Sequence, residues 1–312
     1  MRTPIISPIR RVRPVSMRPA PPQAGENLRG AGLMTLSMVS FGCNDAVMKF
    51  VIQDMPLYQA IFMRGAVVMV FLLALALRKG LGVLHVGSGD RMAMALRLIG
   101  EIASTLLFLN ALHNMAIGNL SAIMQSLPLV VMLAGALVFG ERLGWRRSSA
   151  ALVGLIGVLV ILRPGGELFD IWALVALGSM LMVALRDLST RKFSRAVTTT
   201  AVAFYAAMGV TLMGAIGSAA EGWVAPSPLQ LVLILLAGCF LAVGYMSAVG
   251  AMRIGEISYV APFRYTSLLV AILAGLVLFG EWPDLWTWIG AGLVVGAGLY
   301  TILRESQLGW KR

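Results

Sequence analysis

Four basic side chains lie inside long apolar stretches of the chain, and they are the first candidates for chemistry. They are Lys49, Arg64, Arg97 and Arg264. An arginine at the centre of a membrane-spanning helix costs about 2.5–3.5 kcal/mol on insertion scales. Charges that are kept in spite of this cost commonly serve a substrate or ion pathway. Each of these residues is therefore a candidate for binding a charged group.

Arg264 lies well inside the run 257–279, roughly 10 Å from its beginning if the run is helical. Pro262 breaks the helix beside it and frees a carbonyl, which is tolerated where a membrane helix lines a cavity. Two interpretations are open. Arg264 binds an anionic group such as a carboxylate, with Tyr265 as hydrogen-bond donor or stacking surface, or it pairs with a fixed carboxylate. We favour substrate binding.

Arg64 lies at a similar depth in the run 57–77. It is expected either to bind substrate or to pair with Asp45 as a structural partner. An internal repeat, described below, places Tyr205 at the corresponding position, where ring packing is the alternative to substrate contact. Asn44 and Gln125 are the amide side chains that we expect along the same central path.

Two pairs of opposite charges are spaced four residues apart, so each pair is able to form on one helix face. For Asp45 and Lys49 we favour a salt bridge near the outer gate, and proton uptake by Asp45 is the alternative. Arg97 and Glu101 are expected to form a structural or gating pair, with Glu101 as a second proton candidate.

The composition indicates that the segments carrying these charges are membrane-spanning helices. Of 312 residues, 59% are hydrophobic and 12% charged, against about 45–50% and about 25% in soluble domains. An ordinary cytosolic enzyme and a disordered protein are excluded. The sequence predicts ten apolar runs, nine of them near the roughly 20 residues that a spanning helix needs and the fifth shorter, at about 14. They are 31–52, 57–77, 92–113, 117–139, 149–162, 170–188, 198–220, 229–251, 257–279 and 286–303.

The net charge of +11 follows from where the charges lie. If both termini are cytoplasmic, 20 of the 25 Lys and Arg residues fall in inside segments and only Arg163 falls in an outside loop. This bias predicts a multi-pass protein of the inner or plasma membrane, and no nucleic-acid partner is needed to explain the charge. Residues 1–29 are expected to form a disordered, basic, proline-rich tail, and 305–312 a cytoplasmic C-terminus.

The sequence repeats itself at a distance. Residues 115–141 and 252–281 both open with Ile-Gly-x-aliphatic-Ser and both end with Leu-Ala-Gly-x-x-x-Phe-Gly-Glu. The chain therefore divides into halves of five runs, 30–163 and 164–304. Because five is odd, the second half enters the membrane from the opposite side. Inverted repeats of this kind are typical of secondary transporters with a site near the membrane midplane.

These motifs resemble the drug/metabolite transporter superfamily, specifically its EamA type, over residues 30–304. The matching places are the Phe-Gly-Glu endings at Glu141 and Glu281, the opening of the second run from Pro56 to Arg64, and the end of the sixth run from Arg186 to Lys192. The resemblance implies a ten-helix transporter of small metabolites. The family's substrates include amino acid derivatives, nucleoside cofactors such as S-adenosylmethionine, vitamins such as riboflavin, and drugs.

The sequence thus predicts an all-α integral membrane protein with ten transmembrane helices in two inverted five-helix repeats. We expect a secondary transporter that moves a small polar metabolite by alternating access and that uses no cofactor or metal. A membrane-embedded enzyme acting on lipid would need clustered catalytic groups, and a non-transporting assembly protein is the other alternative. The glycines of the last run are expected to pack within the chain, with a homodimer contact as the alternative.

Overall fold

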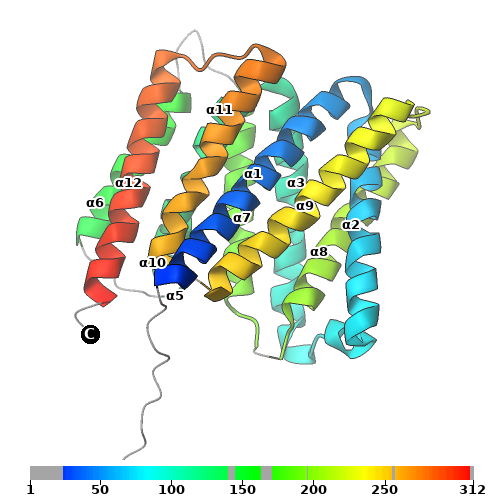
Figure 1. Cartoon of the computed structure of the whole chain (residues 1–312), viewed down its shortest axis with the longest axis horizontal. Coiled ribbons are helices and arrows are strands. Elements are labelled where there is room, and N and C mark those ends of the chain that lie inside the picture. Colours follow the sequence, from blue (N-terminus) through cyan, green and yellow to red (C-terminus); the bar gives the residue numbers. More distant parts are fainter. Residues whose placement is uncertain (1–23, 140–144, 163–170, 195, 255–256, 310–312) are drawn as a thin grey trace, which may run out of the picture.

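The computed structural model describes residues 24–139, 145–162, 171–194, 196–254 and 257–309. All the regular secondary structure in these ranges is α-helix or 3₁₀ helix (Figure 1). The first group comprises α1 (Ala24–Asp54), α2 (Leu57–Lys79), η1 (Leu81–Leu84), η2 (Ser88–Asp90), α3 (Arg91–Asn114), α4 (Ile117–Met124), α5 (Leu127–Phe139) and α6 (Trp145–Leu162). The second group comprises α7 (Ile171–Thr190), α8 (Thr199–Glu221), α9 (Pro228–Ile254), α10 (Ile257–Val260), η3 (Ala261–Tyr265), α11 (Thr266–Phe279) and α12 (Leu285–Gly309).

Helices occupy all ten apolar runs. Seven helical stretches among the described residues are long and apolar enough to cross a membrane, and α6 and α12 contain shorter apolar stretches. The helix α1 has 31 residues and lies outside both sets. The predicted tail is too long by six residues, because 24–29 form the first turns of α1. Residues 1–23 lie outside the described part of the chain.

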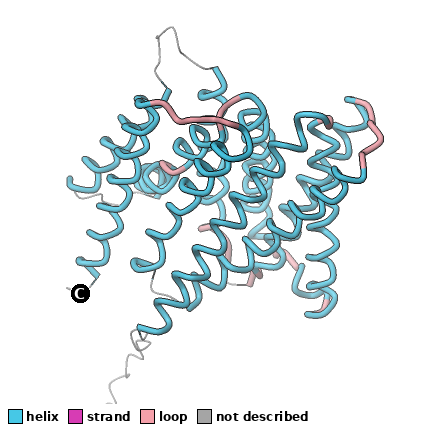
Figure 2. Tube along the Cα trace, turned by 45° about the horizontal axis from the view of Figure 1, so that its top comes forward, coloured by secondary structure: helices cyan, strands magenta, loops and turns pink. Residues whose placement is uncertain are grey.

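The helices pair across the two groups. The helix α1 runs along α9, α2 along α8, α3 along α7, α6 along α12, and α4 along α11. If the helices of the two groups are matched in order, α1 corresponds to α7 and α3 to α9. The pair α1–α9 then corresponds to the pair α3–α7, and each of the other three pairs corresponds to itself. A two-fold relation between the groups produces this pattern, as expected of an internal repeat. Figure 2 shows the same helices in a turned view.

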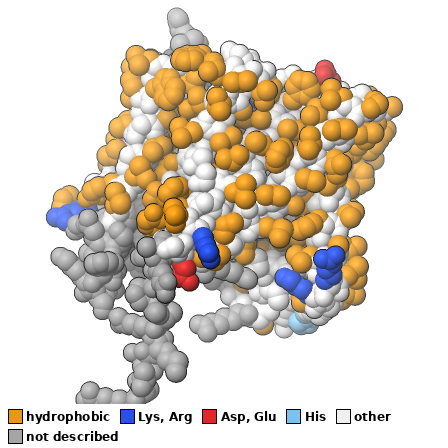
Figure 3. Space-filling view, in the orientation of Figure 1, with side chains coloured by type: hydrophobic (Ala, Val, Ile, Leu, Met, Phe, Trp, Pro, Cys, Tyr) orange, Lys and Arg blue, Asp and Glu red, His pale blue; other side chains and the backbone are white. Residues whose placement is uncertain are grey.

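The bundle has two ends, named here for the residues that mark them. The Asp54 end, at the top of Figure 1, holds the α1–α2, α3–α4, α8–α9 and α11–α12 connections. The Lys79 end, at the bottom, holds the α2–α3 and α7–α8 connections. Figure 3 shows hydrophobic side chains over most of one face and basic side chains near its lower edge.

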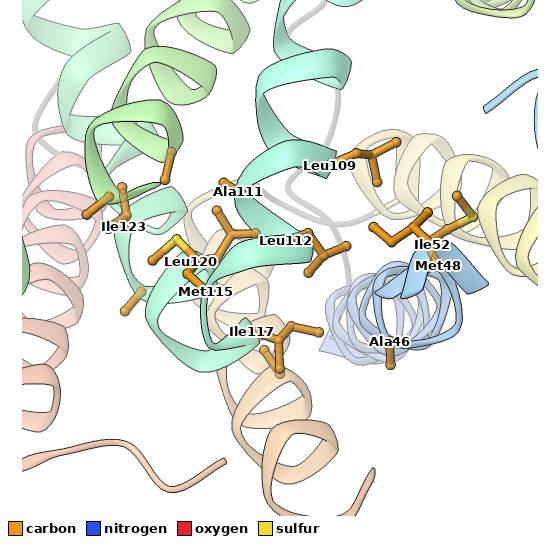
Figure 4. Close-up of a cluster of buried hydrophobic side chains, with 14 of the residues drawn as sticks. Ala46, Met48, Ile52, Leu109, Ala111, Leu112, Met115, Ile117, Leu120 and Ile123 are labelled. Carbon is orange, nitrogen blue, oxygen red and sulfur yellow. The ribbon is translucent and has the colours of Figure 1, made fainter. Parts of the chain in front are cut away.

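The main hydrophobic core lies where α1 meets α3 and α4 (Figure 4). Met48 and Ile52 of α1 face Leu109 and Leu112 of α3, and Ile123 extends the cluster along α4. These side chains are fully or almost fully buried. The core therefore fixes the part of α1 that carries the predicted charged residues.

Glycine allows α6 and α12 to touch along their backbones. A Cβ on Gly157 would lie 2.7 Å from the Gly290 carbonyl oxygen, and a Cβ on Gly290 would lie 2.5 Å from the Gly157 carbonyl oxygen. Carbonyl oxygens cannot move aside as a flexible side chain does. Small residues at this crossing permit close approach of helices in lipid, which confirms the packing role expected for Gly290 in the last run.

Replacement of Gly157 by alanine should therefore destabilise the protein. Overpacking of a close contact costs typically about 1–3 kcal/mol, so the apparent melting temperature of the detergent-purified protein should fall. Gly292→Ala is the matched control on α12, because a Cβ there meets no atom within 4 Å. Equal melting of both variants and the wild type would show that α6 and α12 separate without cost.

Candidate functional site

An amide bridges an acid and a base between α1 and α2. Asn44 donates from Nδ2 to Asp45 Oδ1 at 2.9 Å, and Asn44 Oδ1 accepts from Arg64 Nη1 at 3.5 Å. Asn44 and Arg64 are buried, with Arg64 only 8% exposed. Asp45 and Arg64 also attract each other electrostatically. The structure thus brings three predicted site residues together.

A second charged cluster joins α3 to α7. Each carboxylate oxygen of Glu101 faces one arginine, Arg97 Nη2 at 3.4 Å and Arg186 Nη1 at 3.3 Å. Arg186 Nε also bonds Asp187 at 2.9 Å, and Arg97 donates to the Thr190 hydroxyl. The predicted pair of Arg97 and Glu101 is confirmed. The sequence did not predict that Arg186 shares the same carboxylate.

Tyr245 of α9 connects the two clusters. Its hydroxyl interacts electrostatically with Glu101, Arg186, Arg97 and Arg64. Since these residues belong to α2, α3 and α7, Tyr245 faces the inside of the bundle. Its ring packs edge to face on Phe41, with ring centroids 5.3 Å apart, and the residue is 45% exposed.

The fourth and ninth runs are both broken, and the breaks contact each other. The helix α4 gives way to α5 at Gln125 and Ser126, and α10 gives way to α11 through the 3₁₀ turn η3, which contains Pro262. Gln125 Nε2 donates to Ser267 Oγ at 2.7 Å, and Ser267 Oγ donates to the Arg264 carbonyl at 3.1 Å. The predicted break at Pro262 is confirmed, and Gln125 is buried against α11.

Three other predicted binding residues lie apart from the charged clusters or show no polar contact. Arg264 is exposed, whereas Tyr265 is 9% exposed and packs against Gly298 of α12. The Tyr265 hydroxyl has no hydrogen-bond partner among the described residues. Tyr205 packs edge to face on Phe204, with ring centroids 5.8 Å apart. Arg264 and Tyr265 therefore do not present one shared contact surface.

Lys49 forms a buried ion pair near the Asp54 end of the bundle. It is 4% exposed, donates to the Met115 carbonyl at 2.7 Å and forms an ion pair with Glu281. The other carboxylate oxygen of Glu281 accepts from the Ile117 N–H at 3.0 Å. The ion pair and the two hydrogen bonds beside it thus join three segments: α1, the α3–α4 turn, and Glu281 just after α11.

The predicted salt bridge between Asp45 and Lys49 is wrong, because Lys49 pairs with Glu281 instead. The carbonyl of Met115 and the N–H of Ile117 are end groups of α3 and α4 that lack intrahelical partners. A salt bridge between Asp45 and Lys49 on α1 would leave both of these backbone groups without a partner. Glu281 ends the second copy of the repeat, whereas Glu141, which ends the first copy, lies outside the described residues.

The sequence reasoning missed Tyr245, Arg186 and Ser267. Tyr245 is one aromatic residue in an apolar run, and its electrostatic partners lie on three other helices. Ser267 is 142 residues from Gln125. Only Arg186 carried a signal, since it belongs to the motif that ends the sixth run.

Comparisons with known proteins agree with the repeat. The EamA-like transporter family matches residues 28–163 and again 170–303. A protein named "S-adenosylmethionine uptake transporter" from Rickettsia bellii is 24% identical over 284 residues, which cover 89% of this chain and 94% of that protein. A "Riboflavin transporter" from Rhizobium johnstonii is 28% identical over 186 residues, which cover 60% of this chain and 62% of that protein.

A solved structure shares the fold, with a TM-score of 0.64 at 19% identity over 91% of this chain and 99% of that one. The two family matches cover nearly all of the chain from residue 28 to residue 303. The named relatives that match are transporters. The resemblance that the motifs indicated is therefore confirmed, and the chain belongs to the EamA-like transporter family, as a multi-pass membrane transporter of a small metabolite and not an enzyme.

Proposed function

We propose that this protein moves a small zwitterionic metabolite across the membrane by alternating access. One observation carries the proposal: side chains of both charge signs, from α1, α2, α3 and α7, lie in two clusters inside the bundle. Intramembrane charges that line a cavity mark substrate pathways. A zwitterion matches a site that offers both signs.

Arg64 is the group that we assign to a carboxylate of the substrate. A guanidinium carries five N–H donors in a planar fork that binds carboxylates through two parallel bonds. Among the described residues, Asn44 at 3.5 Å is its hydrogen-bond partner. Arg64 therefore keeps donors for a ligand. Asp45 and Glu101 supply the carboxylates for a cationic group, and proton uptake by either remains part of the proposal.

The names of the relatives narrow the substrate class. S-adenosylmethionine carries a carboxylate, an ammonium, a sulfonium and an adenine ring, whereas riboflavin carries neither a carboxylate nor an ammonium. A site with both charge signs beside Tyr245 suits the first molecule better. We therefore favour an amino acid derivative of the S-adenosylmethionine type over a flavin.

We propose that the ten helical runs cross the membrane ten times, with both termini in the cytoplasm of a cell whose inner or plasma membrane holds the protein. Halves at 30–163 and 164–304 are then inverted repeats. The cross-group pairing of helices supports this arrangement. Under the positive-inside rule, the basic Lys79 end faces the cytoplasm.

Alternating access then requires the two ends to open in turn. The ion pair of Lys49 and Glu281 closes the Asp54 end in the described structure. The pairs α1–α9 and α3–α7 each take one helix from either half, so we propose that they rock against each other as units. Gln125 and Ser267 join the two broken helices at the pivot of this motion.

Arg264, Tyr265 and Tyr205 enter the proposal in narrower roles. Arg264 is exposed within the η3 break. It is assigned to a first contact with a charged group of the substrate as the substrate moves to or from Tyr245. Tyr265 holds the break against α12 through its contact with Gly298. Tyr205 is assigned to the wall of the path and not to a polar contact.

The substrate site is tested by Arg64→Gln. Loss of a charge-assisted hydrogen bond costs about 2 kcal/mol, which is roughly 30-fold in Kd. We expect that loss in the binding of labelled S-adenosylmethionine by the purified protein, and a matching loss of flux in proteoliposomes. Arg78→Gln, at the exposed end of the same helix, is the matched control and should leave both unchanged.

Riboflavin is the second probe in the same assay. Riboflavin flux that is equal in the wild type and Arg64→Gln, together with no binding of S-adenosylmethionine, would overturn the zwitterion site while leaving transport itself intact.

The closure at the Asp54 end is tested by Lys49→Gln. Without the ammonium, the Glu281 carboxylate loses its ion-pair partner and the closed state should be less populated. A cysteine at the buried position Ala46, in a background with Cys43 and Cys239 replaced by serine, reports opening. A membrane-impermeant maleimide added outside cells should label it several-fold faster in Lys49→Gln than in the control Lys79→Gln. Equal labelling rates would remove Lys49 from the gate.

A further inference from the structure

A groove opens between α6 and α12 at the Lys79 end, outside the charged clusters. Its volume is about 300 Å³. The side chains that shape it come from the first turns of α6 and the last turns of α12: Trp145, Arg146, Ser149, Val153, Gly296 and Tyr300. The site proposed above for the transported metabolite uses other helices, so this groove has no part in it.

The groove lies beside the contact of α6 with α12. Gly157 and Gly290 bring the two backbones together nearer the Asp54 end. Further along α12, a Cβ on Gly296 meets no atom within 4 Å. Ala150 and Ala297 are buried beneath the opening. Small side chains thus leave a narrow apolar channel where larger residues would fill the space.

The mouth of the groove is cationic and aromatic. Arg146 is exposed, and its guanidinium lies over the Trp145 ring at 5.3 Å from the centroid. One turn further along α6, the Ser149 hydroxyl donates to the Arg146 carbonyl at 2.9 Å. Trp145 and Tyr300 flank the opening from the two helices. Among the described residues that line the groove there is no acidic side chain.

These features fit one class of occupant, which is a phospholipid with an anionic headgroup. Trp and Tyr concentrate at the height of the lipid headgroups, and an arginine near a membrane surface attracts anionic lipid. The apolar channel continues from the mouth toward Val153 and Gly296, as an acyl chain requires. A soluble phosphate would use the mouth and leave the channel empty.

We propose that the groove between α6 and α12 binds an anionic phospholipid, with the phosphate at the Arg146 guanidinium and an acyl chain beside Gly296. In the orientation proposed above, this end meets the cytoplasmic leaflet, where anionic lipids are concentrated.

The test is native mass spectrometry of the full-length protein with phosphatidylglycerol or phosphatidylcholine added in detergent. The wild type should retain phosphatidylglycerol at least fivefold more tightly than phosphatidylcholine. Arg146→Gln should reduce the affinity for phosphatidylglycerol about fivefold, as expected for one basic residue near a lipid surface. Gly296→Leu should reduce it by at least as much, because the side chain fills the channel.

Gly292→Leu is the matched control. Gly292 lies one turn away on the same exposed face of α12, meets no atom within 4 Å and does not line the groove. It should bind phosphatidylglycerol like the wild type. Gel filtration and thermal melting show whether each variant is folded, and Arg146→Gln tests the proposal alone if Gly296→Leu does not fold.

Three results would overturn the proposal. Equal retention of both lipids by the wild type would exclude recognition of the anionic headgroup. Competition by inorganic phosphate as strong as that by phosphatidylglycerol would assign the mouth to a soluble anion. Conversion of a dimer to a monomer by Gly296→Leu, with lipid retention unchanged, would assign the groove to a contact with a second copy of the chain. None of these results bears on the Arg64 site, which is tested separately.

Discussion

The buried ammonium of Lys49 is the contact on which the architecture of the Asp54 end depends. Because the Lys49 ammonium is buried, it and the helix-end groups around it need partners inside the protein. Glu281 provides two of these contacts, with one carboxylate oxygen for Lys49 and one for the Ile117 N–H. The Met115 carbonyl accepts a second hydrogen bond from the ammonium. One ion pair thereby ties together α1, the α3–α4 turn and the end of α11.

The same constraint explains why the two broken helices meet. A break in a membrane helix exposes backbone groups that need partners from a neighbouring segment. Here the repeat places one break opposite the other, so Gln125 and Ser267 bond across the pair and reach the Arg264 carbonyl. The breaks therefore support each other while the chain around them remains irregular enough to line a path.

Charges in the middle of the bundle follow a different arrangement. Glu101 is shared by two arginines, and Asn44 mediates between Asp45 and Arg64 without a direct ion pair in the described structure. The Asp54 end is joined by a direct ion pair, whereas Arg64 at the centre contacts an amide.

The sequence by itself determined the ten apolar runs, the repeat, the break at Pro262 and the pair of Arg97 and Glu101, because each depends on residues close together in the chain or on composition. It did not determine which charges meet across the bundle. Lys49 and Glu281 are 232 residues apart, and Gln125 and Ser267 are 142 apart. Helix packing decides such contacts, so the spacing of Asp45 and Lys49 led to the wrong pair and Tyr245 gave no signal. Only the tertiary structure brings these groups within reach of one another.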